Sequence, residues 1–209
     1  MSAQAAVAPV AIHRVLPAEE AARGHFYALL ARLLIAPPDG AVLNALACAE
    51  PLAAPGELAD AWQALVDASS VMDADAAAEE HEALFAGMGK ARVSIYAGYY
   101  SGATAVEHPR VRIRADLVAL GLAPRAESTE PEDHLGALFE AMRVLVAGGA
   151  GRSGATLAEQ RRFFEAHVEP AAARFFAALA AAPEANYYRR IADFGAAFVA
   201  LESRSFALD

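Results

Sequence analysis

The sequence predicts an all-α protein, a single globular domain of about nine helices with one long ordered loop. Alanine is the commonest of its 209 residues, and alanine has the highest helix propensity. Runs that alternate apolar and polar residues, as half-buried strands do, are nearly absent. Apolar residues make up 56% of the chain, enough for a sizeable core in one domain or at most two small ones.

The first half of the chain predicts four helices separated by turn residues. Residues 18–35 carry apolar side chains at helical spacing, and Pro37-Pro38-Asp39-Gly40 ends this helix because proline interrupts it. Shorter helices are predicted over 40–49, 56–70 and 74–86. Residues 1–17 are predicted to form a flexible N-terminal segment, which leaves 18–209 as the helical domain.

Residues 87–107 break the helical pattern. They are rich in glycine, tyrosine and small residues and show no 3.6-residue period. We expect an ordered loop that crosses the surface, with at most a stray β-bridge. Loops of this length are uncommon and often carry function.

The second half of the chain predicts five further helices, over 108–121, 131–147, 154–168, 169–181 and 184–206. The glycine-rich stretch 148–154 is predicted to be a flexible connector between two of them. Apolar spacing along these helices predicts the core. Its expected members are Phe26, Leu30, Leu84, Leu138, Phe139, Met142, Phe194 and Phe198.

Charge and targeting patterns limit the partners of the protein. The formal net charge of -9 argues against nucleic acid and anionic membranes and favours a basic partner such as a basic peptide. No apolar run approaches the roughly 18 residues needed to span a bilayer. The first residues lack the pattern of a signal peptide. We therefore expect a cytoplasmic protein without stable membrane insertion.

Cysteine and histidine usage gives no metal or cofactor site. Cys48 is the single cysteine, so an intramolecular disulfide framework and a multi-cysteine metal cluster are excluded. The six histidines lack ligand spacing, and the position four after His81 is Phe85, so a zinc-binding pair is not formed there. His81 is expected on a solvated helix face. We predict neither a metal nor an organic cofactor.

The segment 128–135 places several acids, a proline and a histidine at the start of an amphipathic helix. Thr129 and Glu132 have the spacing of a capping box, and Pro131 suits a first helical turn. The cap does not explain so much charge beside His134, so the acids are expected to face a groove. Three interpretations remain open from the residues alone: a structural cap, a ligand-binding site, or a catalytic cluster of carboxylates with a histidine base.

The stretch 149–154 matches the G-x-G-x-x-G pattern of dinucleotide-binding proteins. That pattern binds phosphate only between a strand and a helix, whereas here a helical pattern precedes it. The linker interpretation is therefore favoured over nucleotide binding.

Three short segments follow one another along the chain: Leu84-Phe85-Ala86-Gly87, Tyr96-Ala97-Gly98-Tyr99-Tyr100 and Glu130-Pro131-Glu132-Asp133-His134. In this order they resemble motifs of the TorD/DmsD family of redox-enzyme maturation chaperones, of which the nitrate reductase chaperone NarJ is a more distant relative. The first is similar to the family's L-F-x-G helix end, and the second to its Y-x-S-x-Y loop, with Gly98 in place of serine. The third is similar to the family's E-P-x-D-H signature.

The resemblance implies a cytoplasmic, non-catalytic chaperone, monomeric or homodimeric. Its implied partners are the twin-arginine signal peptide and the apo-form of a molybdoenzyme of the dimethyl sulfoxide reductase type, which it holds back from export during maturation. On this hypothesis Glu130 and Asp133 accept the arginines, and His134 acts as an orienting or hydrogen-bonding partner. The implied peptide-binding surface also includes Leu84, Phe85, Tyr96, Tyr99, Tyr100 and Pro131. The alternatives are a small enzyme or nucleotide-binding protein that uses Glu130, Asp133 and His134, and a purely structural or assembly subunit.

Overall fold

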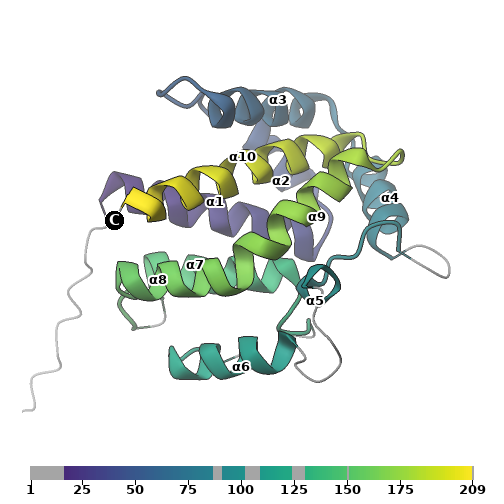
Figure 1. Ribbon diagram of the computed structural model, residues 1–209. Coiled ribbons are helices and arrows are strands. Elements are labelled where there is room, and N and C mark those ends of the chain that lie inside the picture. Colours follow the sequence, from purple (N-terminus) through teal and green to yellow (C-terminus); the bar gives the residue numbers. More distant parts are fainter. Residues whose placement is uncertain (1–16, 87–90, 102–108, 124–129, 150, 209) are drawn as a thin grey trace, which may run out of the picture.

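The computed structural model of the protein describes residues 17–86, 91–101, 109–123, 130–149 and 151–208. Over these residues the chain is all-helical, and two isolated β-bridges are its β-structure (Figure 1). The predicted all-α fold is confirmed. Residues 1–16 of the predicted flexible segment lie outside the described part of the chain.

Every helix predicted from the sequence has a counterpart in the structure. One further short helix, α5, lies inside the segment predicted to be a loop, and a π-helical turn joins α8 to α9. The helices are α1 (Ala18–Ile35), α2 (Gly40–Ala47), α3 (Glu57–Val71), α4 (Ala74–Phe85), α5 (Ala97–Tyr100), α6 (Pro109–Ala119), α7 (Leu135–Ala147), α8 (Leu157–Phe163), the π-helix η1 (Phe164–Val168), α9 (Glu169–Ala181) and α10 (Tyr187–Leu208).

Helices α1 and α10 run through the middle of the molecule, with α3 on one side and α7 and α8 on the other (Figure 1). Helices α1 and α7 are antiparallel and closely packed. A Cβ on Gly24 would lie 3.4 Å from Ala147 Cβ at one end of the pair, and a Cβ on Gly136 would lie 2.6 Å from Ile35 Cγ1 at the other. Glycine at these positions therefore lets the two helices approach.

The predicted core residues are buried, apart from Phe26, which is half-buried and packs against the core. The ring of Phe26 contacts the rings of Phe194 and Trp62, with centroids 5.2 Å and 5.5 Å away. Aromatic pairs at such distances add to the stabilisation from apolar burial. This aromatic cluster fastens α1 and α3 to α10.

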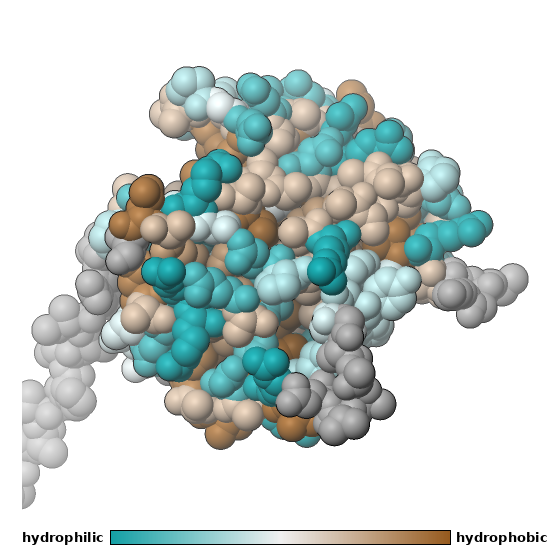
Figure 2. Space-filling view, in the orientation of Figure 1, coloured by the Kyte–Doolittle hydropathy of each residue, from teal (hydrophilic) through white to brown (hydrophobic). Residues whose placement is uncertain are grey.

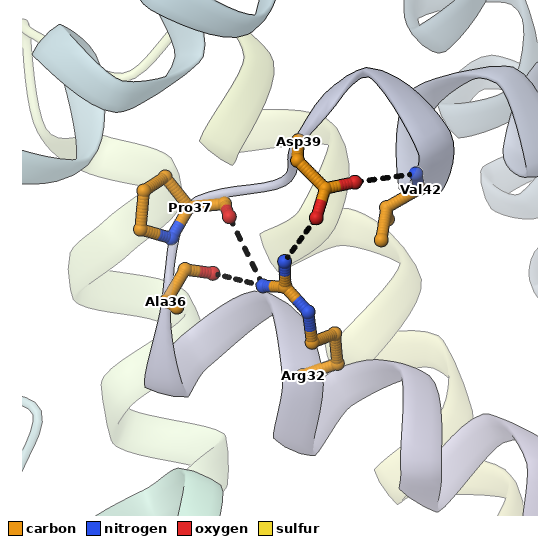
Figure 3. Close-up of polar contacts among 5 residues, drawn as sticks. All are labelled: Arg32, Ala36, Pro37, Asp39 and Val42. Carbon is orange, nitrogen blue, oxygen red and sulfur yellow. Dashed lines mark hydrogen bonds and ion pairs between the residues drawn. The ribbon is translucent and has the colours of Figure 1, made fainter.

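A polar cluster closes the corner between α1 and α2 (Figure 3). Arg32 donates to the carbonyl oxygens of Ala36 and Pro37, 3.0 Å away in each case, and to Asp39 Oδ2 at 3.1 Å. Asp39 Oδ1 also accepts from Val42 N at 2.9 Å, so Asp39 caps α2. The predicted helix end at Pro37-Pro38-Asp39-Gly40 is thus stabilised by the last turn of α1.

Two long-range polar contacts hold the C-terminal helix. Glu202 of α10 accepts two hydrogen bonds from Arg23, at 2.7 Å and 2.8 Å, and one from Tyr27 at 2.8 Å. The Glu80 carboxylate of α4 accepts from the backbone N–H groups of residues 186–188 at the start of α10. An acid suits the positive end of a helix dipole. Glu80 thereby fixes α4 against α10.

In the part of the chain that the structure describes, no helix combines the length and the apolar character of a membrane span.

Candidate functional site

The tyrosine-rich segment and the acidic turn, far apart in the sequence, are joined by main-chain hydrogen bonds. Ala97 N donates to Asp133 O at 2.7 Å, and Leu135 N donates to Ile95 O at 3.0 Å. Tyr96 and His134 form the isolated antiparallel bridge between them. The structure therefore brings two of the three motifs of the sequence into one surface region.

This pairing explains why the predicted start of α7 is wrong. The capping box of Thr129 and Glu132 predicts a helix from residue 131, but α7 begins at Leu135 and its N-cap is His134. The main chain of residues 133–135 pairs with residues 95–97, so it cannot be helical there. Thr129 lies outside the described residues. Pro131 O accepts from His134 N at 2.9 Å in the turn that precedes the helix.

The His134 ring is held in one orientation. Its Nδ1 accepts from Gly136 N at 3.1 Å, which leaves Nε2 facing Glu130 Oε2 at 3.8 Å. Burial is the largest influence on the ring and lowers the pKa of His134 below its ordinary value. His81 acts in the same direction, while Glu130 and Asp133 oppose it. The neutral ring with a proton on Nε2 follows from this geometry.

Glu132 and Asp133 face the arginines of α6. Asp133 Oδ1 lies 3.3 Å from Arg110 Nε, and Glu132 Oε1 accepts from Arg114 Nε at 2.7 Å. Hydrogen bonding to its own backbone N–H, followed by the guanidinium of Arg114, lowers the pKa of Glu132 against the opposing effect of burial. Both side chains are largely buried, with 7% of Asp133 and 13% of Glu132 exposed. The acidic turn already holds guanidinium groups.

The tyrosines of the α5 segment differ in exposure. Tyr99 is 71% exposed and Tyr96 is 40% exposed, whereas Tyr100 is buried and its hydroxyl donates to Ser94 O at 2.7 Å. The ring of Tyr96 meets that of His134 edge to face, with centroids 5.7 Å apart. Burial raises the pKa of Tyr100, so its hydroxyl stays protonated at neutral pH. Two aromatic side chains therefore stand exposed beside the acidic turn.

Gly98 allows the close approach of α5 to the acidic turn. A Cβ on Gly98 would lie 3.0 Å from Asp133 Oδ2, which is tighter than ordinary van der Waals contact. A larger residue at this position would press on the carboxylate that faces Arg110. The glycine that stands here in place of the serine of the related motif therefore leaves room for the Asp133 carboxylate.

The Leu84-Phe85 segment supports this surface from behind. Leu84 has no exposed surface, and its carbonyl oxygen accepts from Val93 N at 3.1 Å, so α4 anchors the start of the tyrosine-rich segment. Phe85 is half-buried against the rings of His81 and Tyr188, at 5.0 Å and 5.4 Å. His81 is half-buried, with its Nε2 buried, rather than on a fully solvated helix face as predicted. Burial lowers the pKa of His81.

The glycine-rich stretch after α7 is a chain reversal, as far as the structure describes it. Gly149 and Arg152 exchange two main-chain hydrogen bonds of 3.0 Å. Gly148 has φ 73°, and a Cβ on Gly154 would lie 2.5 Å from Val146 O. The glycines are therefore required by the turn against the end of α7. A helix precedes the stretch, so it lacks the strand that a dinucleotide fingerprint needs.

Sequence reasoning missed the arginine partners of the acidic turn. Arg110 and Arg114 are four residues apart on α6 and so lie on one helix face. The signal is the cluster of Arg110, Arg112 and Arg114, three cations within five residues of an acidic chain. Among the residues that the structure describes, no three His, Cys, Asp or Glu side chains gather as metal ligands would.

The family of the chain follows from comparison with known proteins. The family described as nitrate reductase delta subunit matches residues 52–177, which is more than half of the chain and includes both bridged segments, α4 and α6. Proteins of this class are non-catalytic chaperones of molybdoenzyme maturation, which interact with molybdoenzyme subunits and their leader peptides. This protein belongs to the nitrate reductase delta subunit family. No curated protein matches the chain.

Proposed function

We propose that the protein binds the twin-arginine leader peptide of a molybdoenzyme in the cytoplasm and delays export until the enzyme has matured. Family membership supports the chaperone role. The similarity of the three motifs to TorD/DmsD proteins supports a client of the dimethyl sulfoxide reductase type. The proposal assigns no catalytic step and no cofactor to the chain.

One observation carries the proposal: the acidic turn holds guanidinium groups beside exposed tyrosines. Glu132 and Asp133 each contact an arginine of α6. Tyr96 is bridged to His134, at the end of the same turn. A twin-arginine leader combines an arginine pair with an apolar segment, so its two parts match the two parts of this surface.

The chemistry of each part suits a leader peptide. A guanidinium group binds a carboxylate in a bidentate manner, and such charge-assisted bonds are stronger than neutral ones. Glu130, at the edge of the turn, has 33% of its side chain exposed and can meet an incoming cation together with Asp133. The net charge of -9 favours the approach of a basic peptide over longer distances.

Under this proposal the residues of the candidate surface divide into those that contact the leader and those that support them. Tyr96, Tyr99 and Glu130 are exposed or partly exposed and are proposed to contact the leader. Asp133 and His134 lie beneath them and are proposed to receive and orient the arginines. The proposed supports are Leu84, Phe85, Tyr100 and Pro131, which pack behind or beside the surface.

Calorimetric titration of a synthetic twin-arginine leader into wild type and Asp133→Asn tests this function. A hydrogen bond to a charged group contributes about 1.5–3 kcal/mol, so the variant is expected to bind roughly ten- to a hundredfold more weakly. Asparagine keeps the shape of the side chain. Thermal melts of both proteins confirm that the difference is not a loss of folded protein.

Glu140→Gln is the matched control. It removes the charge of an acid on α7 that pairs with Arg143, with 2.7 Å between Glu140 Oε2 and Arg143 Nε, and Glu140 is not part of the acidic turn. The control is expected to bind like wild type. A leader with lysines in place of its arginines is expected to bind more weakly to wild type, because lysine lacks the bidentate geometry. Equal binding by wild type and Asp133→Asn, per folded molecule, contradicts the proposal.

A further inference from the structure

Helix α6 lies at one edge of the molecule, below α7 and α8 in the view of Figure 1. Ile113 is its buried residue, whereas Val111 and Val118 are each 68% exposed. Figure 2 shows hydrophobic residues along the same lower edge of the molecule. Ile113 and the half-buried Leu117 attach α6 to the core on one face, and polar contacts add to this attachment at its N-terminal end.

The N-terminal half of α6 is held by the acidic turn. Arg110 Nε lies 3.3 Å from Asp133 Oδ1, and Arg110 Nη2 lies 3.6 Å from Glu132 Oε2. Arg114 Nε donates to Glu132 Oε1 at 2.7 Å. Two arginines four residues apart thus converge on two adjacent acids, so α6 occupies the turn as an arginine-bearing segment would.

The acids are fixed and the arginines are exposed. The side chains of Arg110 and Arg114 are 41% and 64% exposed, against 7% for Asp133 and 13% for Glu132. Water reaches the arginine side of each pair, whereas the carboxylates are largely buried and need a cationic partner. An incoming guanidinium group that replaces Arg110 or Arg114 keeps these carboxylates paired.

The C-terminal half of α6 has separate attachments. Asp116 Oδ2 lies 2.6 Å from His167 Nε2 of the π-helix η1, and Arg152 Nη1 donates to Gly121 O at 3.1 Å. Neither contact involves Glu132 or Asp133. The arginines can therefore leave the acidic turn while the far end of α6 remains attached.

We propose that α6 is an internal competitor for the leader site: Arg110 and Arg114 occupy Glu132 and Asp133 in the free protein, and the arginines of a client replace them. This inference rests on the proposed function. An occupied site lowers the apparent affinity by the fraction of molecules in which the site is open. The free chaperone is thereby protected from weakly basic peptides, and its surface charge is partly neutralised until a client arrives.

Titration of the same leader peptide into Arg110→Gln and Arg112→Gln tests the competition. Both variants remove one positive charge from α6, but Arg112 is exposed and forms no ion pair with the residues that the structure describes. Arg110→Gln is expected to bind the leader about three- to tenfold more tightly than Arg112→Gln, since it removes the competitor for Asp133. The double variant Arg110→Gln with Arg114→Gln is expected to bind more tightly still.

The outcomes separate this inference from the proposed function. If the leader binds the two single variants and the double variant, but Arg110→Gln binds it no more tightly than Arg112→Gln, the competitor role is wrong and the function stands. If the leader binds none of them, the proposed function is wrong and the competitor role falls with it. Thermal melts check folding, and amide hydrogen exchange of the free proteins gives an independent readout. The α6 amides should exchange faster in Arg110→Gln than in Arg112→Gln, and equal exchange overturns the inference.

Discussion

At the scale of single residues, His134 links three parts of the candidate site. Its backbone bridges to Tyr96, its Nδ1 caps α7 through Gly136 N, and its Nε2 faces Glu130. Because the ring is 5% exposed, a charge on it would lack solvation. The neutral ring is therefore part of the folded structure.

This burial predicts a loss of stability on mild acidification. Burial, with His81, lowers the pKa of His134 in the folded protein despite Glu130 and Asp133. A histidine in the unfolded chain has a pKa of about 6.5, so below that pH the unfolded state binds protons more readily and stability falls. The lowered pKa of Glu132 acts in a different window, below about pH 4.5. Melting temperatures measured from pH 7.5 to about 5 should decrease.

The matched variant for this prediction is His134→Asn. Asparagine caps helices well and does not titrate, so the acid-induced decrease should be smaller in the variant than in wild type. His81 also has a lowered pKa and accounts for part of the remaining slope. An equal slope in both proteins, or a melting temperature that rises on acidification, contradicts the assignment to His134.

At the scale of helices, close packing of α9 on α10 depends on Gly195. A Cβ at this position would lie 2.2 Å from Phe176 Cζ, so the buried ring of Phe176 would have to move. Gly195→Ala is therefore expected to cost about 1–3 kcal/mol or more in the free energy of unfolding, measured by urea denaturation. Gly40→Ala is the control, because a Cβ there meets no atom within 4 Å. Gly40→Ala should change the free energy by less than about 0.5 kcal/mol, and similar effects of the two substitutions would refute the packing account.

The helices could be predicted from the sequence because their signals are local. Apolar spacing and the turn residues from Pro37 to Gly40 predict α1 and its end correctly. The start of α7 could not be predicted, since the bridge between Tyr96 and His134 overrides the local capping signal of Thr129. Helix α5 is a single turn, too short to show a helical period.

The candidate site was predicted in part. The motif residues predict which segments matter, and the structure joins the segments of Tyr96 and Asp133 through main-chain hydrogen bonds. The partners Arg110 and Arg114 could not be inferred, because an ion pair between α6 and the turn depends on tertiary packing. The arginine cluster of residues 110–114 is visible in the sequence, but local patterns do not indicate which acids it meets.

At the scale of the whole molecule, leader binding is proposed to occur on one side of the helical domain. The core helices α1, α7 and α10 form a scaffold, while α5, the acidic turn and α6 lie together at its periphery (Figure 1). A rigid scaffold with functional segments on its surface is a common arrangement in binding proteins. The central claim is therefore that the leader contacts these peripheral segments and leaves the opposite side of the domain unchanged.

Amide hydrogen exchange of the wild-type protein, with and without a saturating twin-arginine leader, shows which segments the leader contacts. Exchange reports local opening and the loss of solvent access along the whole chain. The account predicts slower exchange in residues 95–99 and 130–136 when the leader is bound, and unchanged exchange in α3, on the other side of α10. Protection confined to α3 or α8, with none in the α5 segment or the acidic turn, would contradict the account.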